Sequence, residues 1–458
     1  MNQALSFPER FLYHIWDGQK YQPRMTTESG KLLRVLFPGE WNTDSGPDFR
    51  HAIVQIGDVI YKGDVEIHIK AKDWFAHHHQ KDSAYNKIIL HVVFQNIQSS
   101  PYITTENGIK VETVALSRFI EKPLITLQKQ FSTSKPPDSK TFCVRFARTS
   151  FYQVESFLEE MGFRRLERKV SRFAAEKSFC DYNELLYKGI MEALGYSKNK
   201  TPMLNLSEYV RLPQLQKLIA DGTDLDSIIA LLLGSSGLIN KLPMSLTQKQ
   251  QQLWQKRYSL SRSHPTTLLL EWNLFRQRPG NHPAIRLLQA AAFFYENSTP
   301  LHHILRGFSL LKESNDFQQP LRNLDTLFEA SGKLLPESCG IGKSRVRIIT
   351  VNVIIPLILL YAREHHYKDF EQYLLRFYQH FAPLPPNRTT RYMEKFLDNH
   401  QCKVQRKRAI LQQGLTELYH TRCSKHLCYK CESETADEIV VREQQSPYYA
   451  VANNTMVN

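Results

Sequence analysis

The chain has 458 residues, of which 42% are hydrophobic and 23% charged, and this balance excludes a largely disordered protein and predicts roughly two or three folded domains. The formal net charge of +14 favours a polyanionic partner, either nucleic acid or a membrane surface, unless the charge is spread over a solvated surface. No signal peptide is visible. The longest apolar run, 348–361, contains Asn352 and Pro356, which indicates a buried core helix with a proline kink. We therefore expect a cytoplasmic protein without a membrane partner.

Residues 1–125 alternate helical and strand-like patterns. The two β-rich runs on either side of Gly57-Asp58 predict a hairpin, because such a short loop joins antiparallel strands. The apolar run at 88–94 is typical of a strand buried on both faces. In chain order we predict a helix over 7–16, strands over 31–37, 51–56 and 59–69, a helix over 73–80 capped by Asp73, and strands over 88–94 and 110–115.

The rest of the chain is predicted to be helical. A Ser/Pro-rich stretch indicates a linker over 126–142, and apolar residues at three- and four-residue spacing predict a helical domain over 143–400 without a second sheet. Residues 401–432 are predicted to form a C-terminal helix with a cysteine cluster, and 433–458 a disordered tail. The fold class is therefore α+β, with a mixed α/β sheet domain followed by a large all-helical region.

The predicted strand 59–69 and the residue after it carry the first chemical motif. Residues two apart share one face of a strand, and the polar ones here are Asp64, Glu66, His68 and Lys70. Asp48, at the head of the partner strand, is placed to close over the same face. Two carboxylates and a nitrogen ligand suit a divalent cation such as Mg²⁺ or Mn²⁺, which polarises phosphoryl oxygens. The alternative is an edge hairpin whose polar face simply meets water.

Pro47-Asp48 and Glu66-Ile67-His68, set in this order of helix, strands, helix and strand, resemble the PD-(D/E)XK nuclease superfamily. The resemblance covers residues 1–125 and implies a nuclease-like fold in which Asp48 and Glu66 are metal ligands. His68 stands where that pattern has a lysine. The resemblance therefore implies that His68 or Lys70 orients the attacking water or stabilises the transition state.

Several longer stretches are similar to an uncharacterised bacterial family with a domain of unknown function, found largely in Bacteroidetes-type genomes. These stretches are FPGEWN (37–42), SGPDF (45–49), GDVEIH (63–68), LHVV (90–93) and QQGL (412–415), together with Trp74 and the histidines at 77–79. The similarity spans nearly the whole chain. It implies membership of that family, which supplies no established activity.

Additional candidates lie close to the acidic motif. The predicted helix 73–80 carries consecutive histidines at 77–79, of which we select His79, and His91 interrupts the apolar strand 88–94. A lone histidine on a buried strand is more often a satisfied core residue than a ligand. Glu40 precedes Asp48 in a loop rich in Gly, Asn and Asp, where functional residues concentrate. The additional site candidates are Glu40, Asp64, His79 and His91.

Three thiols within nine residues form the second motif. Cys423, Cys428 and Cys431 are spaced closely enough to share one zinc ion or iron–sulfur cluster. The fourth ligand is Cys402, His420 or His426, and a site closed by four ligands predicts a structural role. The alternative is a reduced loop at the surface.

Basic residues form the third feature. Arg164, Arg165, Arg168 and Arg172 recur at three- and four-residue spacing, which is typical of a helix that follows phosphates. Glutamates of the same segment make intrahelical salt bridges the alternative. The stretch GIGKS at 340–344 lacks the spacing of a phosphate loop and follows no strand, so ATP binding there is rejected.

These features support two functions. The first is a metal-dependent nuclease that hydrolyses phosphodiester bonds of DNA, with Mg²⁺ or Mn²⁺ at the acidic motif and zinc or an iron–sulfur cluster at the cysteines. The second is a non-catalytic nucleic-acid-binding or assembly protein with a degenerate nuclease fold. A bound cation at Asp48 and Glu66 favours the first, whereas a Lys70–Glu66 ion pair favours the second.

Overall fold

The computed structural model describes residues 7–42, 45–95, 100–132, 151–196, 198–260, 267–275, 279–309, 317–336, 339–398 and 408–425. Its internal contacts divide the chain into two compact units, and each is described by itself. The sheet unit comprises Met1–Arg145, Ala174–Ser178 and His420–Thr435. The helical unit comprises Phe146–Phe173, Phe179–Tyr419 and Ala436–Asn458.

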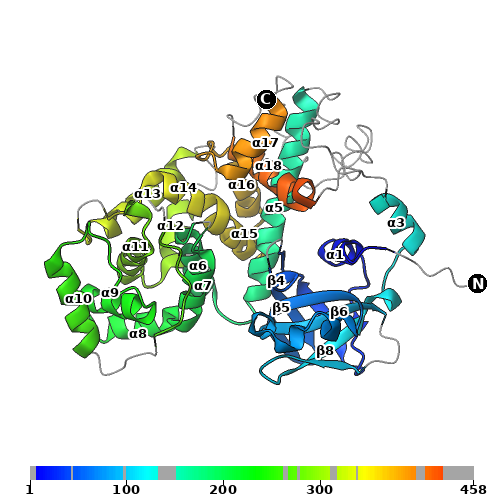
Figure 1. Ribbon diagram of the computed structural model, residues 1–458. Helices are drawn as coiled ribbons and strands as arrows, with labels where there is room; N and C mark the ends of the chain where they lie inside the picture. Colours follow the sequence, from blue (N-terminus) through cyan, green and yellow to red (C-terminus); the bar gives the residue numbers. More distant parts are fainter. Residues whose placement is uncertain are drawn as a thin grey trace, which may run out of the picture. The chain divides into compact units, whose positions relative to one another are not determined.

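The sheet unit is built on a mixed sheet of eight strands (Figure 1). The strands are β1 (Met25–Thr26), β2 (Leu32–Phe37), β3 (Glu40–Trp41), β4 (Phe49–Ile56), β5 (Val59–Lys70), β6 (Ile88–Gln95), β7 (Tyr102–Thr104) and β8 (Lys110–Ala115). Their spatial order is β1-β2-β4-β5-β6-β8-β7, with β3 paired to β4. β6 runs parallel to β5 and β8, and the other neighbours are antiparallel. The predicted α+β class is therefore confirmed.

The β4–β5 hairpin is confirmed. Gly57, with a φ of +59°, supplies the left-handed turn residue, and Ile56 pairs with Val59. On β5 the apolar residues Val65 and Ile67 are fully buried in a core that also contains the apolar side of α1 (Arg10–Asp17). Because side chains alternate along a strand, Glu66 and His68 lie on the opposite face of the sheet.

A bulge interrupts the pairing of β4 with β5 between Phe49 and Ala52. Within it, His51 adopts a left-handed conformation with a φ of +59°, and its backbone N–H donates to Asp64 Oδ1 at 3.0 Å. Bulges redirect the neighbouring side chains of a strand. Here the bulge lies directly after Asp48, one of the predicted metal ligands.

Several local expectations were wrong. The helix expected at 73–80 is a four-residue helix, α2 (Asp73–Ala76), followed by a 3-10 turn, η1 (His79–Lys81). Lys72 is its N-cap residue, whereas the Asp73 carboxylate accepts from the N–H of Lys70. The first part of the expected linker belongs to α3 (Leu124–Ser132), and residues 133–150 lie outside the described residues.

Segments remote in sequence complete the sheet unit. Ala175, from the end of α5 (Phe151–Glu176), packs with Phe37 and Ile53. Lys425 is 5% exposed, and its Nζ lies 3.1 Å from Asp17 Oδ2 and 3.9 Å from the centre of the Trp41 ring. The sheet unit therefore includes contacts made by residues near the C-terminus.

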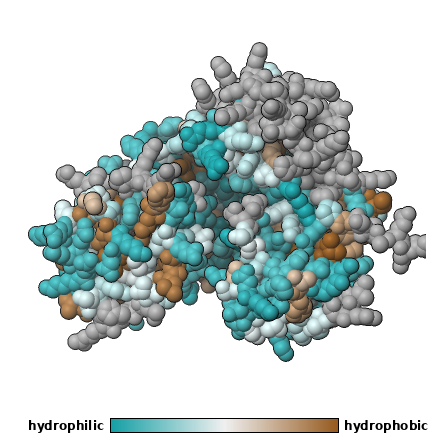
Figure 2. All heavy atoms as spheres, viewed as in Figure 1, coloured by the Kyte–Doolittle hydropathy of each residue, from teal (hydrophilic) through white to brown (hydrophobic). Residues whose placement is uncertain are grey.

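The helical unit contains no strand among the residues that the structure describes, as predicted. Besides most of α5, its helices are α6 (Tyr182–Leu194), α7 (Lys200–Tyr209), α8 (Leu212–Ala220), α9 (Leu225–Ser235), α10 (Gln248–Leu260), α11 (Pro283–Glu296), α12 (Pro300–Ser309), α13 (Gln318–Gly332), α14 (Lys343–Ile349), α15 (Ile355–Glu364), α16 (Lys368–Gln379), α17 (Arg388–Asp398) and α18 (Ala409–Thr421). On the visible face of both units, apolar side chains lie in small groups among hydrophilic ones (Figure 2).

The continuous helix Lys343–Glu364 is long and apolar enough to cross a membrane by length and composition, but 72% of its apolar window is buried within the protein. Such burial is typical of a core helix. A π-helical turn, Thr350–Ile354, lies within it and precedes Pro356, which has no N–H to donate to the preceding turn.

Candidate metal centre on the mixed sheet

Two carboxylates meet where β4 begins and β5 passes beside it. Glu66 Oε2 accepts a 3.1 Å hydrogen bond from the N–H of Asp48, and Asp48 Oδ2 accepts a 3.0 Å hydrogen bond from the N–H of Ile67. Each carboxylate is therefore held by a backbone N–H: that of Asp48 holds Glu66, and that of Ile67, the residue after Glu66, holds Asp48. Glu66 is only 5% exposed, so this pair sits inside the protein surface and not on an open edge.

Two imidazoles lie beside the second oxygen of Glu66, and a third lies beside one of them. His79 Nε2 lies 3.3 Å and His68 Nε2 lies 3.8 Å from Glu66 Oε1, and His68 Nε2 lies 3.2 Å from His77 Nδ1. Ligand atoms of His68, His77 and His79 all lie within 4.8 Å of one another. Neutral imidazole nitrogens this close to a carboxylate form the donor set that proteins use for divalent transition metals.

The turn after α2 places His77 and His79 next to His68. His78 between them has a left-handed φ of +61°, which reverses the chain so that its two neighbours face the cluster and His78 itself is exposed. The His79 ring packs 3.9 Å, centre to centre, from that of Tyr85. His77 is exposed, whereas His68 is buried, so the cluster has one side open to solvent.

His91, on β6, supports His68 from the interior. Its Nε2 lies 2.9 Å from His68 Nδ1, and its Nδ1 lies 3.4 Å from Thr113 Oγ1 on β8. If His68 Nε2 offers its lone pair to a metal, His68 Nδ1 carries the proton and donates it to His91. The lone histidine of the buried strand is thus satisfied by hydrogen bonds and fixes the orientation of a candidate ligand.

Burial sets the protonation of this cluster. It raises the pKa of Asp48 to about 7, with the Glu66 charge adding to the effect, and it raises the pKa of Glu66 to about 8. Burial and the neighbouring imidazoles lower the pKa of His68 to about 2, and burial lowers that of His91 to about 3. Neutral imidazoles are the form that binds metals, and a cation would stabilise both carboxylates in their ionised form.

Helix α1 supplies two residues that the sequence did not single out. The Tyr13 side chain hydrogen-bonds to Asp48, and burial raises the pKa of this tyrosine. Burial, followed by the charge of Asp48, raises the pKa of Glu9 to about 7. Their four-residue spacing in the predicted helix places both on one helix face, but nothing in the sequence indicates that this face meets Asp48.

Three other predicted residues lie elsewhere. Lys70 is exposed at the end of β5, and Glu40 is exposed on β3 opposite Arg50. Asp64 binds the backbone of His51, and burial raises its pKa. Among the described residues no Lys70–Glu66 ion pair closes the site, since Glu66 contacts His79 instead.

The predicted basic stripe has partners within the helical unit. Arg165 and Arg168 reach Glu417 of α18 at 3.4 and 2.7 Å, and Arg172 reaches Glu192 of α6 at 2.9 Å. One intrahelical pair joins Arg164 to Glu160, at 2.5 Å. These contacts bind α5 to its neighbours, so a phosphate would have to compete with carboxylates already in place.

The cysteine cluster stays a prediction. Cys423 lies in a short 3-10 turn at the end of the described chain, whereas Cys402, Cys428, Cys431 and His426 lie outside the described residues, as does the expected tail at 433–458.

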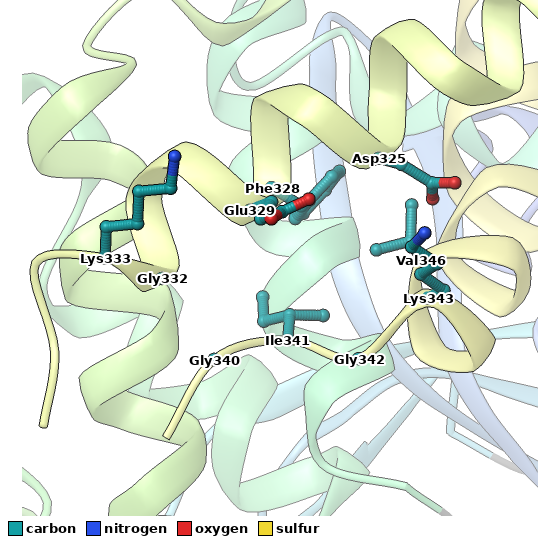
Figure 3. Close-up of a pocket in the computed structure, with 10 residues that line it drawn as sticks. All are labelled: Asp325, Phe328, Glu329, Gly332, Lys333, Gly340, Ile341, Gly342, Lys343 and Val346. Atoms are coloured by element: carbon teal, nitrogen blue, oxygen red, sulfur yellow. The ribbon is translucent and has the colours of Figure 1, made fainter. Parts of the chain in front are cut away.

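A hollow of about 280 Å³ opens between α13 and the loop that leads into α14 (Figure 3). Gly340, Gly342 and Lys343 of the GIGKS stretch form one wall, and Asp325 and Glu329 lie on the other. The lining also includes Lys333, and Asp325 is bound to Arg347, so the rejection of ATP binding there stays a prediction.

A family model described as a protein of unknown function (DUF2851) matches residues 9–384. The match extends from the start of α1, through the cluster of carboxylates and histidines, to just beyond α16. No curated protein and no solved structure matches the chain significantly.

Proposed function

We propose that this chain, which belongs to the DUF2851 family of proteins of unknown function, is a metal-dependent phosphodiesterase that acts on DNA. The observation that carries the proposal is the convergence of Asp48, Glu66, His68, His77 and His79.

The nitrogen donors of His68, His77 and His79 would hold one divalent cation. Glu66 Oε1, at 3.3 Å from His79 Nε2 and 3.8 Å from His68 Nε2, would lie beside it together with Asp48 and balance its charge. Nitrogen donors favour Mn²⁺ or Zn²⁺ over Mg²⁺, which prefers oxygen ligands. When bound, such an ion polarises a phosphoryl oxygen and lowers the pKa of a bound water.

The protein's own groups would orient the reaction. Tyr13 hydrogen-bonds to the Asp48 carboxyl, which a bound cation would keep ionised and able to accept a proton from water as a general base. His68 takes the position of the lysine in the nuclease pattern, but it is buried and neutral, so it would act as a ligand and not as a cation. Because His77 is exposed, a phosphate group would reach the bound ion from the solvent side of His77.

Strand order supports phosphodiester chemistry over other hydrolysis. A helix, the antiparallel strands β2, β4 and β5, the short α2 and the parallel β6 follow the order that suggested the PD-(D/E)XK superfamily, with Asp48 and Glu66 on adjacent strands. The net charge of +14 favours a polyanionic substrate.

Cleavage of single- and double-stranded DNA with Mn²⁺, Zn²⁺ or Mg²⁺ tests the proposal. Glu66→Gln removes one ligand charge and keeps the side-chain shape, so we expect a loss of about 10²- to 10⁴-fold in rate. Asp58→Asn, in the exposed hairpin turn, is the matched control and should cleave like the wild type. Cleavage that survives both EDTA and Glu66→Gln would contradict the proposal.

The second candidate is a DNA-binding or assembly protein with a degenerate nuclease fold. The exposed position of Lys70, away from the cluster, favours it, because the cluster then has no lysine. DNA binding without cleavage under any of the three metals would support this second function.

A further inference from the structure

Two arginines of the helical unit share one aromatic ring. Arg286, on α11, is 7% exposed, and Arg345, on α14, is half-buried. Their guanidinium carbons lie 4.7 and 3.2 Å from the centre of the Tyr196 ring. Two positive charges are therefore held close together in a region of low solvent access.

The hydrogen bonds of both side chains go to neutral groups. Arg345 donates to the Ala193 carbonyl at 3.3 Å. Arg286 donates to the side-chain oxygens of Gln289 and Asn281, each at 2.6 Å, and to the Tyr196 hydroxyl. The Nε atom of each arginine is buried without a hydrogen-bond partner.

Neither guanidinium has a carboxylate within ion-pair distance in the part of the chain that the structure describes. Two other half-buried arginines of this unit are paired with carboxylates. Arg347 binds Asp325 through two hydrogen bonds of 2.6 and 2.7 Å, and Arg363 binds Glu167 through two of 2.7 and 2.8 Å. The pair on Tyr196 departs from this pattern.

An unpaired buried charge is unfavourable, and a second charge of the same sign beside it adds to the cost. The aromatic ring offsets only a small part of it. Burial, together with the charge of Arg286, lowers the pKa of Arg345 to about 10, so its side chain is still protonated at neutral pH. An anion would remove the imbalance.

The backbone under the ring is also constrained. Tyr196 has a left-handed φ of +55° directly after Gly195, the C-cap residue of α6, a common way for a helix to end. This turn sets the position of the ring that both guanidinium groups contact.

We propose that Arg286 and Arg345, arranged on Tyr196, form a binding site for a phosphate monoester dianion. Its two negative charges match the two guanidiniums, and its oxygens can take paired N–H donors in the bidentate manner that arginine favours. The dianion is either the phosphate of a free nucleotide or the 5′-phosphate end of a DNA strand. This site is independent of the metal cluster.

Isothermal titration of the metal-free full chain in EDTA tests the site without interference from the metal cluster. The probes are inorganic phosphate, 5′-dAMP, a 5′-phosphorylated oligonucleotide and the same strand with a 5′-hydroxyl. We expect phosphate to bind and Arg345→Gln to weaken it at least ten-fold, with Arg345→Lys between the two. Arg388→Gln, at an exposed position of α17, should bind like the wild type.

Stability separates a binding role from a structural one. Without phosphate, Arg345→Gln should melt no lower than the wild type, because it removes an uncompensated charge, and phosphate should no longer raise its Tm. Tighter binding of the 5′-phosphorylated strand than of 5′-dAMP assigns the site to strand ends, and the reverse assigns it to nucleotides. Absence of phosphate binding, equal affinity for acetate, or unchanged affinity in Arg345→Gln would overturn the proposal.

Discussion

His91 Nε2 lies 2.9 Å from His68 Nδ1, and this contact places a buried imidazole of β6 directly behind a candidate metal ligand of β5. A histidine held in this way presents a fixed tautomer and a fixed ring orientation. The arrangement makes the interior of the sheet part of the candidate metal centre.

Replacement of His91 by Leu should weaken Mn²⁺ binding about 10- to 100-fold, because His68 loses the acceptor that fixes its Nδ1 proton. Titration calorimetry of the purified protein measures the affinity. His78→Asn, a neighbouring histidine that is exposed and whose left-handed backbone asparagine tolerates, is the matched control and should leave affinity unchanged. Equal affinity in His91→Leu and the wild type would remove His91 from the site.

Metal-free protein should lose stability as the pH rises. The folded-state pKa values of Asp48 and Glu66, about 7 and about 8, exceed their ordinary values of 3.8 and 4.5. Their favourable contribution is complete below the ordinary values and is lost as the pH rises through 7 to 8. The buried imidazoles of His68 and His91 act in the opposite sense below the ordinary histidine pKa of 6.5, where the unfolded chain binds their protons. Thermal unfolding in EDTA above that value, up to pH 9, should therefore show a falling Tm that Mn²⁺ reverses at the alkaline end.

Glu66→Gln should reduce this pH dependence, because glutamine does not titrate. The comparison must be made with EDTA present, since a bound cation keeps both carboxyls ionised. A Tm that rises over this range in the metal-free wild type would show that the two acids are already ionised in the folded protein.

Asp64→Ala should destabilise the sheet unit by about 1 kcal/mol, because the partly buried N–H of His51 in the bulge loses its acceptor. Metal affinity should fall too, since the bulge sets the position of Asp48. Asp64→Asn keeps an acceptor oxygen and should retain most of both properties. Denaturant unfolding and Mn²⁺ titration of the two variants distinguish a supporting role for Asp64 from a direct one, in which Asn would fail like Ala.

Gly414→Ala should destabilise the helical unit by about 1–3 kcal/mol or more, because a Cβ there would meet the Leu158 carbonyl oxygen of α5 at 1.9 Å. Gly307→Ala, also in a helix but with its nearest neighbour at 3.5 Å, is the control and should be neutral or stabilising. Urea unfolding measures both. Similar behaviour of the two variants would mean that α18 does not approach α5 this closely.

The sequence predicts local patterns well and long-range pairings poorly. The alternation along β5 identified Glu66 and His68 as neighbours on one face, and the turn at Gly57 identified the hairpin. Which of the three consecutive histidines face the cluster depends on the left-handed φ of His78. A histidine in the sequence gives no sign that its backbone adopts this conformation.

Contacts between residues that are far apart along the chain were not predictable either, because a periodic pattern carries only local information. The arginines of α5 were assigned to phosphates because their periodicity is local, whereas the Glu417 that receives Arg168 lies 249 residues away. Short elements such as β1 and β3, of two residues each, are created by pairing with a neighbouring strand and leave no periodic signal.

The contact of Lys425 with Asp17 and Trp41 has a consequence for how the protein is made. Lys425, which contacts the Trp41 ring and pairs with Asp17, lies 408 residues after Asp17, so it leaves the ribosome long after the strands that it contacts. The sheet unit is therefore complete only after the helices between β8 and Lys425 have been translated. A fragment that ends after β8 would leave Asp17 and the Trp41 ring without Lys425.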